Sequence, residues 1–158
     1  MKHPFFLVAI LLTCMSLVAC IQGSSVKETK NWVPTPYDTL NNFEGVSMTV
    51  KKGSVSQTEL IVVFENSSNK QAIYGDYFSL EKKLDGDWYQ VPTIIDEYGF
   101  DDISYELGPS EPSELKVDWE WLYGKLGTGE YRIIKDVSDF RSPGDFDEYY
   151  VAASFTID

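Results

Sequence analysis

Acidic side chains form the most conspicuous groups in this sequence that could do chemistry. The two groups are Asp96, Glu97, Asp101 and Asp102, and, beyond Pro143, Asp145, Asp147 and Glu148. Calcium binds about six to eight oxygen atoms, so either group is a candidate calcium site at one end of a domain. Neither group has the spacing of a helix-loop-helix calcium site, and a solvated acidic loop is the alternative. We therefore assign no metal and no cofactor, and keep these acids as candidates.

Histidine and cysteine do not occur after position 20. The single histidine is His3, and the two cysteines are Cys14 and Cys20. Catalysis by Ser-His-Asp or Cys-His groups, and zinc binding by imidazole or thiolate, need side chains that the rest of the chain lacks. A glycan hydrolase needs two carboxylates about 5 to 9.5 Å apart and no histidine. No paired-acid motif stands out, so we expect no enzymatic activity, with such a hydrolase as the remaining catalytic alternative.

Aromatic residues make up 15% of the sequence, and one group of them does not follow a strand-like alternation. This group consists of Tyr98, Phe100 and Tyr105. Exposed rings of this kind can stack on a sugar or pack against a protein, so we predict a ligand-binding surface here. The alternative is that the three rings close one end of the core.

The N-terminus has the three regions of a secretory signal. They are a basic start at Lys2, an apolar core over residues 5–12, and the small-residue tetrad Leu17, Val18, Ala19 and Cys20. The tetrad resembles the lipobox of bacterial lipoproteins, which implies that Cys20 is lipidated and becomes the first residue of the mature chain. A transmembrane anchor is the alternative, but the apolar stretch is short for a span of about 20 residues and no basic cluster follows it.

This resemblance implies an address and a first partner. Residues 1–19 are a signal peptide, residues 20–43 a lipidated tether, and residues 44–158 a single domain. The acylated Cys20 anchors the chain in the lipid bilayer, because a diacylglycerol supplies the two acyl chains that stable anchoring needs. The domain then faces outside the cytoplasm at the cell membrane. Within the tether, Trp32, Val33 and Tyr37 could instead dock on the domain as an edge strand.

The formal net charge is −12. Nucleic acid binding requires a basic patch that displaces counterions from phosphates, and the basic residues here are scattered. We therefore expect no nucleic acid partner. A negative surface keeps an exported domain soluble.

The apolar residues of the domain recur with a period of two, which is typical of strands with one buried face. The alternating segments are 46–50, 78–84, 115–121, 131–137 and 149–157, and Asp85-Gly86 predicts a tight hairpin turn. Residues 60–64 form a continuous apolar run, as expected for a central strand. No stretch has a helical period. We predict an all-β antiparallel sandwich of about seven strands without a disulfide. Trp119 and Trp121 share the phase of Val117, which predicts that both are buried.

A short motif indicates the type of sandwich. Gly127, Gly129 and Tyr131 precede Ile133, as in the tyrosine corner of immunoglobulin folds, where the hydroxyl bonds to the backbone of the preceding loop. A half-buried tyrosine at a sheet edge is the alternative. Tyr131 is thus a candidate structural residue.

Two longer stretches resemble the bacterial immunoglobulin-like domain of exported lipoproteins. They run from Gly75 to Tyr89, with Tyr77, Leu80 and Trp88, and from Trp119 to Lys135, with Tyr123, Leu126, Gly129 and Tyr131. The resemblance covers roughly residues 45–157. It implies an immunoglobulin-like fold and an exported location, and no shared catalytic activity.

The expected function is therefore that of a lipid-anchored, extracytoplasmic immunoglobulin-like module that acts by binding. The ligand is left open between an extracytoplasmic protein and a glycan. A carbohydrate-binding or cell-wall-binding module is the main alternative.

Overall fold

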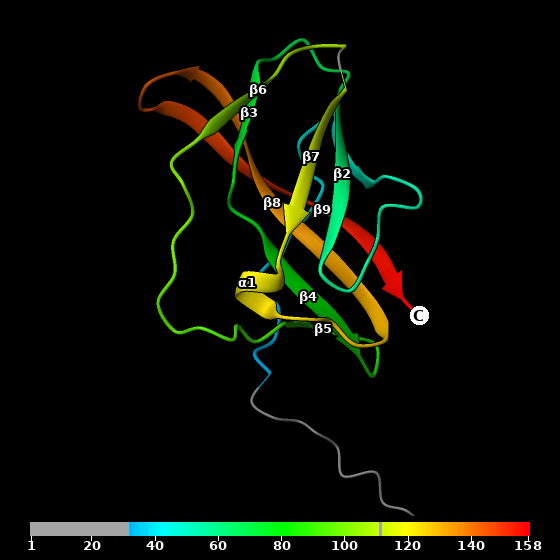
Figure 1. Ribbon diagram of the computed structural model, residues 1–158. Coiled ribbons are helices and arrows are strands. Elements are labelled where there is room, and N and C mark those ends of the chain that lie inside the picture. The colour runs from blue at the N-terminus through cyan, green and yellow to red at the C-terminus, as the bar shows by residue number, and fades with distance from the viewer. Residues whose placement is uncertain (1–31, 111) are drawn as a thin grey trace, which may run out of the picture.

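The computed structural model describes residues 32–110 and 112–158 (Figure 1). The signal, the tetrad and Cys20 lie outside these residues. The described chain forms two antiparallel sheets, which confirms the predicted all-β immunoglobulin-like sandwich. It contains nine strands instead of about seven, and one helical turn, α1 (Glu120–Tyr123). Residues 32–158 contain no cysteine, so this part of the sandwich holds together without a disulfide.

The smaller sheet has three strands in the order β1 (Val46–Val50), β2 (Glu59–Asn66) and β7 (Ser113–Asp118). The larger sheet has the order β5 (Asp87–Gln90), β4 (Ser79–Leu84), β8 (Gly129–Ser142), β3 (Ala72–Gly75) and β6 (Ser104–Leu107), and β9 (Asp145–Ile157) pairs with β8. The apolar run of β2 lies between β1 and β7, as expected for a central strand. Asp85 and Gly86 both have positive φ in the turn between β4 and β5, which confirms the predicted hairpin.

The core lies between the inner faces of the two sheets. Leu60, Val62 and Phe64 of β2 are fully buried, and Val151 of β9 is fully buried as well. Trp119 is also fully buried, as predicted, with its ring 5.6 Å from that of Phe155.

The prediction that Trp121 is buried is wrong, because its side chain is 43% exposed. The strand phase ends at Asp118, whose carboxylate accepts a hydrogen bond from the Glu120 backbone N–H at 2.9 Å. An aspartate that bonds the backbone two residues on favours a turn over a continuing strand. Gly124, with φ of 68°, ends the resulting helical turn. Trp121 therefore points outward from α1.

The longest strand, β8, organises the larger sheet. Along one edge it pairs with β9, and along the other it pairs first with β4 and then with β3. Tyr74 pairs with Val137 and Ser79 pairs with Ile134. From Tyr74 to Ser79 the chain advances five residues, whereas the partner strand β8 advances only three between Ile134 and Val137. β3 and β4 are therefore one strand that is interrupted by a bulge with two extra residues. We call residues 75–78 the β3–β4 bulge.

Lys135 fills the inside of this bulge. Its side chain is fully buried and its ammonium donates to the carbonyl oxygens of Gly75 and Tyr77, each at 2.6 Å. A bulge leaves backbone groups without ladder partners, and buried polar groups without partners are costly. The lysine therefore satisfies two carbonyls that the sheet cannot.

The segment before β1 crosses the outer face of the larger sheet. Val33 and Thr35 make backbone hydrogen bonds with Gln90 and Trp88 of β5, at 2.8 and 3.0 Å. Further along, the Asn41 N–H donates to the carbonyl oxygen of Tyr150 on β9 at 2.8 Å. Residues 32–41, which belong to the predicted tether, thus lie against the domain, with one isolated β-bridge between Pro34 and Tyr89.

This strap, residues 32–41, covers a buried ion pair. Glu81 is fully buried and accepts from the Arg132 guanidinium at 2.6 Å, and Arg132 also donates to the Thr35 hydroxyl at 3.1 Å. A buried charge is tolerated only when paired. Docking of the strap thus completes the outer face of the sheet.

No helix among the described residues has the length and apolar character needed to cross a bilayer.

Tyr131 is almost fully buried on β8, and its hydroxyl donates to the carbonyl oxygen of Gly127 at 2.8 Å. This is the bond that a tyrosine corner requires.

Tyr131→Phe should lower the free energy of unfolding by about 1 kcal/mol, because one buried hydrogen bond is lost while the ring remains. Urea denaturation measures the change. Tyr98→Phe, whose ring is 49% exposed, is the control and should change stability by less than about 0.5 kcal/mol. Equal stability of Tyr131→Phe and the unaltered protein would contradict a structural role for the hydroxyl.

Candidate ligand-binding site

Three exposed aromatic rings surround Phe100 on one side of the sandwich. The Phe100 ring lies 5.3 Å from that of Tyr77, 6.1 Å from that of Tyr98 and 5.8 Å from that of Trp121. We call Tyr77, Tyr98, Phe100 and Trp121 the aromatic platform. The predicted candidates Tyr98 and Phe100 are therefore brought together, and two further rings join them.

Three separate segments supply these rings. Tyr77 comes from the β3–β4 bulge, Tyr98 and Phe100 from the loop over residues 91–103, and Trp121 from α1. The loop is fastened to α1 by a hydrogen bond from the Ile94 N–H to the Leu122 carbonyl oxygen at 2.9 Å. Figure 1 shows this loop running along one side of the sandwich from β5 to β6.

The platform is exposed although its base is anchored in the core. Trp121 and Tyr77 are 43% and 37% exposed, whereas Phe100 is half-buried and packs edge-on against the buried Phe78 at 5.3 Å. Ile94 and Ile103, in the same loop, are also exposed. Exposed apolar side chains that gather on one face of a protein often mark an interaction surface, whereas single scattered ones do not.

Tyr105 does not join the platform. It lies on β6, where its ring stacks on that of Tyr74 at 5.3 Å, and Tyr74 in turn stacks on Phe64 of the core. A hydrogen bond with the Asp76 carboxylate raises the pKa of Tyr105. Tyr105 thus packs beside the core and holds the bulge residue Asp76.

A cavity of about 350 Å³ lies next to the platform, between the bulge and β7. We call it the β7 groove. The residues that line it include Phe78, Phe100 and Trp121, the acidic residues Asp76 and Asp101, and residues 115–118 of β7. A second cavity, of about 220 Å³, lies on the other side of the bulge and is lined by Asp76, Asp101, Asp102 and Asp136 among others.

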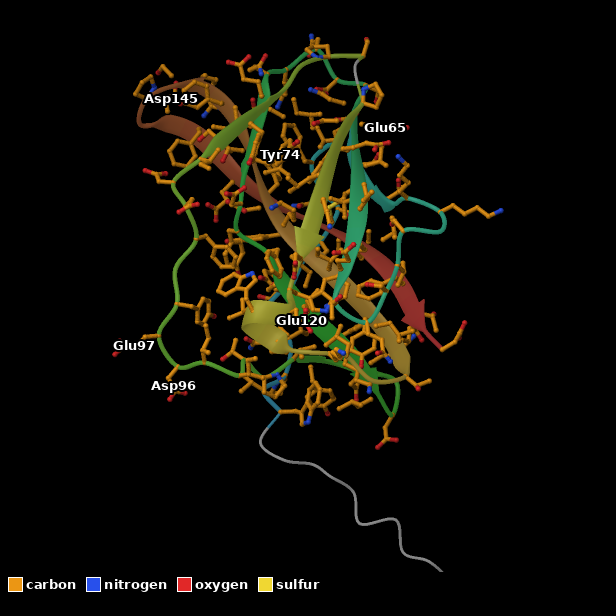
Figure 2. All side chains as sticks on the ribbon, viewed as in Figure 1. Glu65, Tyr74, Asp96, Glu97, Glu120 and Asp145 are labelled. Atoms are coloured by element: carbon orange, nitrogen blue, oxygen red, sulfur yellow. The ribbon has the colours of Figure 1, made fainter. Side chains whose placement is uncertain are left out.

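The predicted acidic groups do not come together. Asp96 and Glu97 project from the outer turn of the loop, whereas Asp145 lies at the far tip of the β8–β9 hairpin (Figure 2). At that tip Arg141 donates to Asp145 at 2.9 Å and to Asp147 at 3.0 Å. Within residues 32–110 and 112–158, no three acidic side chains meet with the geometry of a metal site.

Sequence reasoning missed Asp76, Tyr77 and Trp121. Gly75 and Asp76 are turn-favouring residue types within the bulge, but the segments on both sides continue as strands on the same partner, so the pair does not locate a bulge by itself. A signal did exist for Trp121: Asp118 and Gly124 bracket the helical turn, and both residue types favour turns.

Residues 42–156 match the family model of the bacterial Ig-like domain, so the protein belongs to this family. Domains of this family are typically non-catalytic interaction folds. Among solved structures, the chain is similar to the ASH/PapD-like domain of human CEP192 (PapD-like domain 7), with 16% identity and a TM-score of 0.35 over 70% of this chain and 82% of that chain. The comparison with curated proteins returns no match.

Burial lowers the pKa of the Lys135 ammonium from its ordinary value to about 8, and the neighbouring carboxylates of Asp136 and Asp76 partly oppose this shift. In the unfolded chain the lysine titrates near 10.4. Between these values the unfolded chain binds more protons than the folded protein, so stability should rise with pH.

The free energy of unfolding should therefore increase by about 1.5 kcal/mol between pH 8 and pH 9.5. Above pH 10 it should fall again, because burial raises the pKa values of Tyr37 and Tyr123 and the unfolded phenols ionise first. Urea denaturation across this pH range measures both effects. Lys135→Met should remove the rise between pH 8 and 9.5, and a rise that persists in this variant would show that another group causes it.

Proposed function

We propose that this protein is a lipid-anchored, extracytoplasmic interaction module that binds a partner protein through its aromatic platform. The observation that carries the proposal is the convergence of rings from the bulge, the loop and α1 into one exposed surface. Tyrosine and tryptophan are enriched at the energetic centres of protein interfaces. Family membership supports a binding role over a catalytic one.

The angles between the rings favour a protein partner over a sugar. The Tyr98 and Phe100 rings meet at 90°, and the Phe100 and Trp121 rings meet at 73°. A glycan stacks on an open ring face, but in an edge-to-face arrangement the edge of one ring covers the face of the next. The clefts between such rings fit side chains of a protein better.

The position of the platform relative to the proposed anchor also supports a role near the membrane. The described chain begins at the end of the sandwich that carries α1 and the β4–β5 hairpin (Figure 1). Residues 20–31 span at most about 40 Å when fully extended. With Cys20 lipidated, the platform would lie within reach of the exposed parts of membrane proteins.

A photo-reactive amino acid at position 98 should crosslink the protein to a specific partner in living cells. The same amino acid at position 146 is the matched control, because Phe146 is an exposed ring, 50% accessible, on the distant β8–β9 hairpin. Trp121→Ala should reduce the crosslink from position 98, as identified by mass spectrometry. Equal crosslinking from both positions, or none from position 98, would contradict the proposed surface.

Cys20→Ala should abolish palmitate incorporation, because the thiol that would carry the acyl chains is gone. Labelling of cells with radioactive palmitate measures the loss. Cys14→Ala, within the proposed signal, is the control and should leave labelling unchanged. Palmitate labelling that persists in Cys20→Ala would contradict anchoring through this residue.

A further inference from the structure

The β7 groove has an open strand edge as one wall. β7 pairs with β2 and, within the described chain, with no other strand. Four consecutive residues, 115–118, line the groove. Successive side chains of a strand point to opposite faces, so a cavity touched by consecutive residues lies along the edge of the strand and not on one face.

The pairing register shows which backbone groups face this edge. The Trp119 N–H donates to the Thr58 carbonyl oxygen at 2.9 Å, and Val117 lies opposite Leu60. In an antiparallel pair, bonded and non-bonded residues alternate. The N–H and C=O groups of Glu114 and Lys116 therefore point away from β2, toward the open edge, where an extended peptide can pair with them.

The groove is negatively charged although a lysine lies on its wall. The Lys116 ammonium forms an ion pair with the Glu59 carboxylate of β2 at 2.8 Å, so its positive charge is already neutralised. Three acidic residues, Asp76, Asp101 and Asp118, line the groove, and the whole chain carries a net charge of −12. Two of these carboxylates are held in place, Asp76 by Tyr105 and Asp118 by the Glu120 N–H.

The aromatic residues that line the groove also favour a positively charged ligand. Phe78, Phe100 and Trp121 line the groove together with the carboxylates. Ring faces attract ammonium and guanidinium groups through the negative potential above the ring, and the attraction grows when the site excludes water. An extended segment with a basic side chain thus matches the strand edge, the carboxylates and the rings at once.

Resting on the proposed function, we infer that the β7 groove binds an extended segment of the partner protein and receives a lysine or arginine side chain from it. The segment adds to β7 as an antiparallel or parallel strand. Its basic side chain lies against Phe100 and Trp121 and pairs with Asp101 and Asp118. The neighbouring residues of the partner then contact the platform.

The test uses the full lipidated protein in nanodiscs of a neutral lipid and a blocked pentapeptide, Thr-Val-Lys-Val-Thr, as the probe. Two matched peptides carry acetyl-lysine or glutamate in place of the lysine. Binding is followed by calorimetry and by tryptophan fluorescence. The lysine peptide should bind at least about tenfold more tightly than either matched peptide, and added salt should weaken its binding.

Variants assign the effect to the groove. Asp101→Asn should weaken binding of the lysine peptide by about five- to tenfold, because a charge-assisted contact is lost. Asp96→Asn removes an exposed acid of the same loop that does not line the groove, and it should leave binding unchanged. Both substitutions are isosteric and avoid the buried core.

Three results would overturn the inference: no binding of the lysine peptide, equal binding of all three peptides, or equal losses in Asp101→Asn and Asp96→Asn. Crosslinking from position 98 in cells together with any of these results would leave the proposed function standing and remove the basic-segment inference. Peptide binding without crosslinking would remove the proposed partner at the platform instead.

Discussion

The hydrogen bonds from the buried Lys135 ammonium to the carbonyl oxygens of Gly75 and Tyr77 are the interaction on which the candidate site depends. They lie where the sheet cannot supply partners, because the β3–β4 bulge interrupts pairing with β8. An ammonium in the core is costly, and its lowered pKa of about 8 records that cost. In return, the two hydrogen bonds hold the backbone of the bulge in one defined shape.

The shape of the bulge determines where several side chains of the candidate site lie. The bulge directs Tyr77 into the platform and Asp76 into the two cavities beside it, while Phe78 remains in the core and supports Phe100. Bulges commonly re-aim side chains next to functional sites. The loop over residues 91–103 and α1 pack around this base, where Phe100 contacts Phe78 and the Ile94 N–H bonds to the Leu122 carbonyl oxygen. This arrangement explains how a small sandwich with no catalytic residues assigned can present a specific surface.

The sequence predicted the parts of the fold that rest on alternation and on turn chemistry. The alternating residues of β9, the central strand β2 and the Asp85-Gly86 turn all follow from local patterns. The positions of the bulge and of the strap over residues 32–41 could not be predicted from local patterns, because both depend on contacts between segments that are distant in the sequence. Lys135 shares the strand phase of Ile133 and Val137 and is buried like them, but the two carbonyl groups that it bonds belong to the bulge and have no signal in the local pattern. Trp121 was misplaced because strand phase was extended through Asp118 into a helical turn.

The central claim is that the surface around Phe100 is where this module meets its partner. Hydrogen–deuterium exchange by mass spectrometry, comparing the purified protein with the protein in membranes that hold its crosslinked partner, tests this claim most directly. The account predicts slower exchange in residues 96–103, 113–123 and 75–78 when the partner is present, with no change in residues 141–147. Protection confined to the β8–β9 hairpin, or unchanged exchange in the three segments around Phe100, would contradict it.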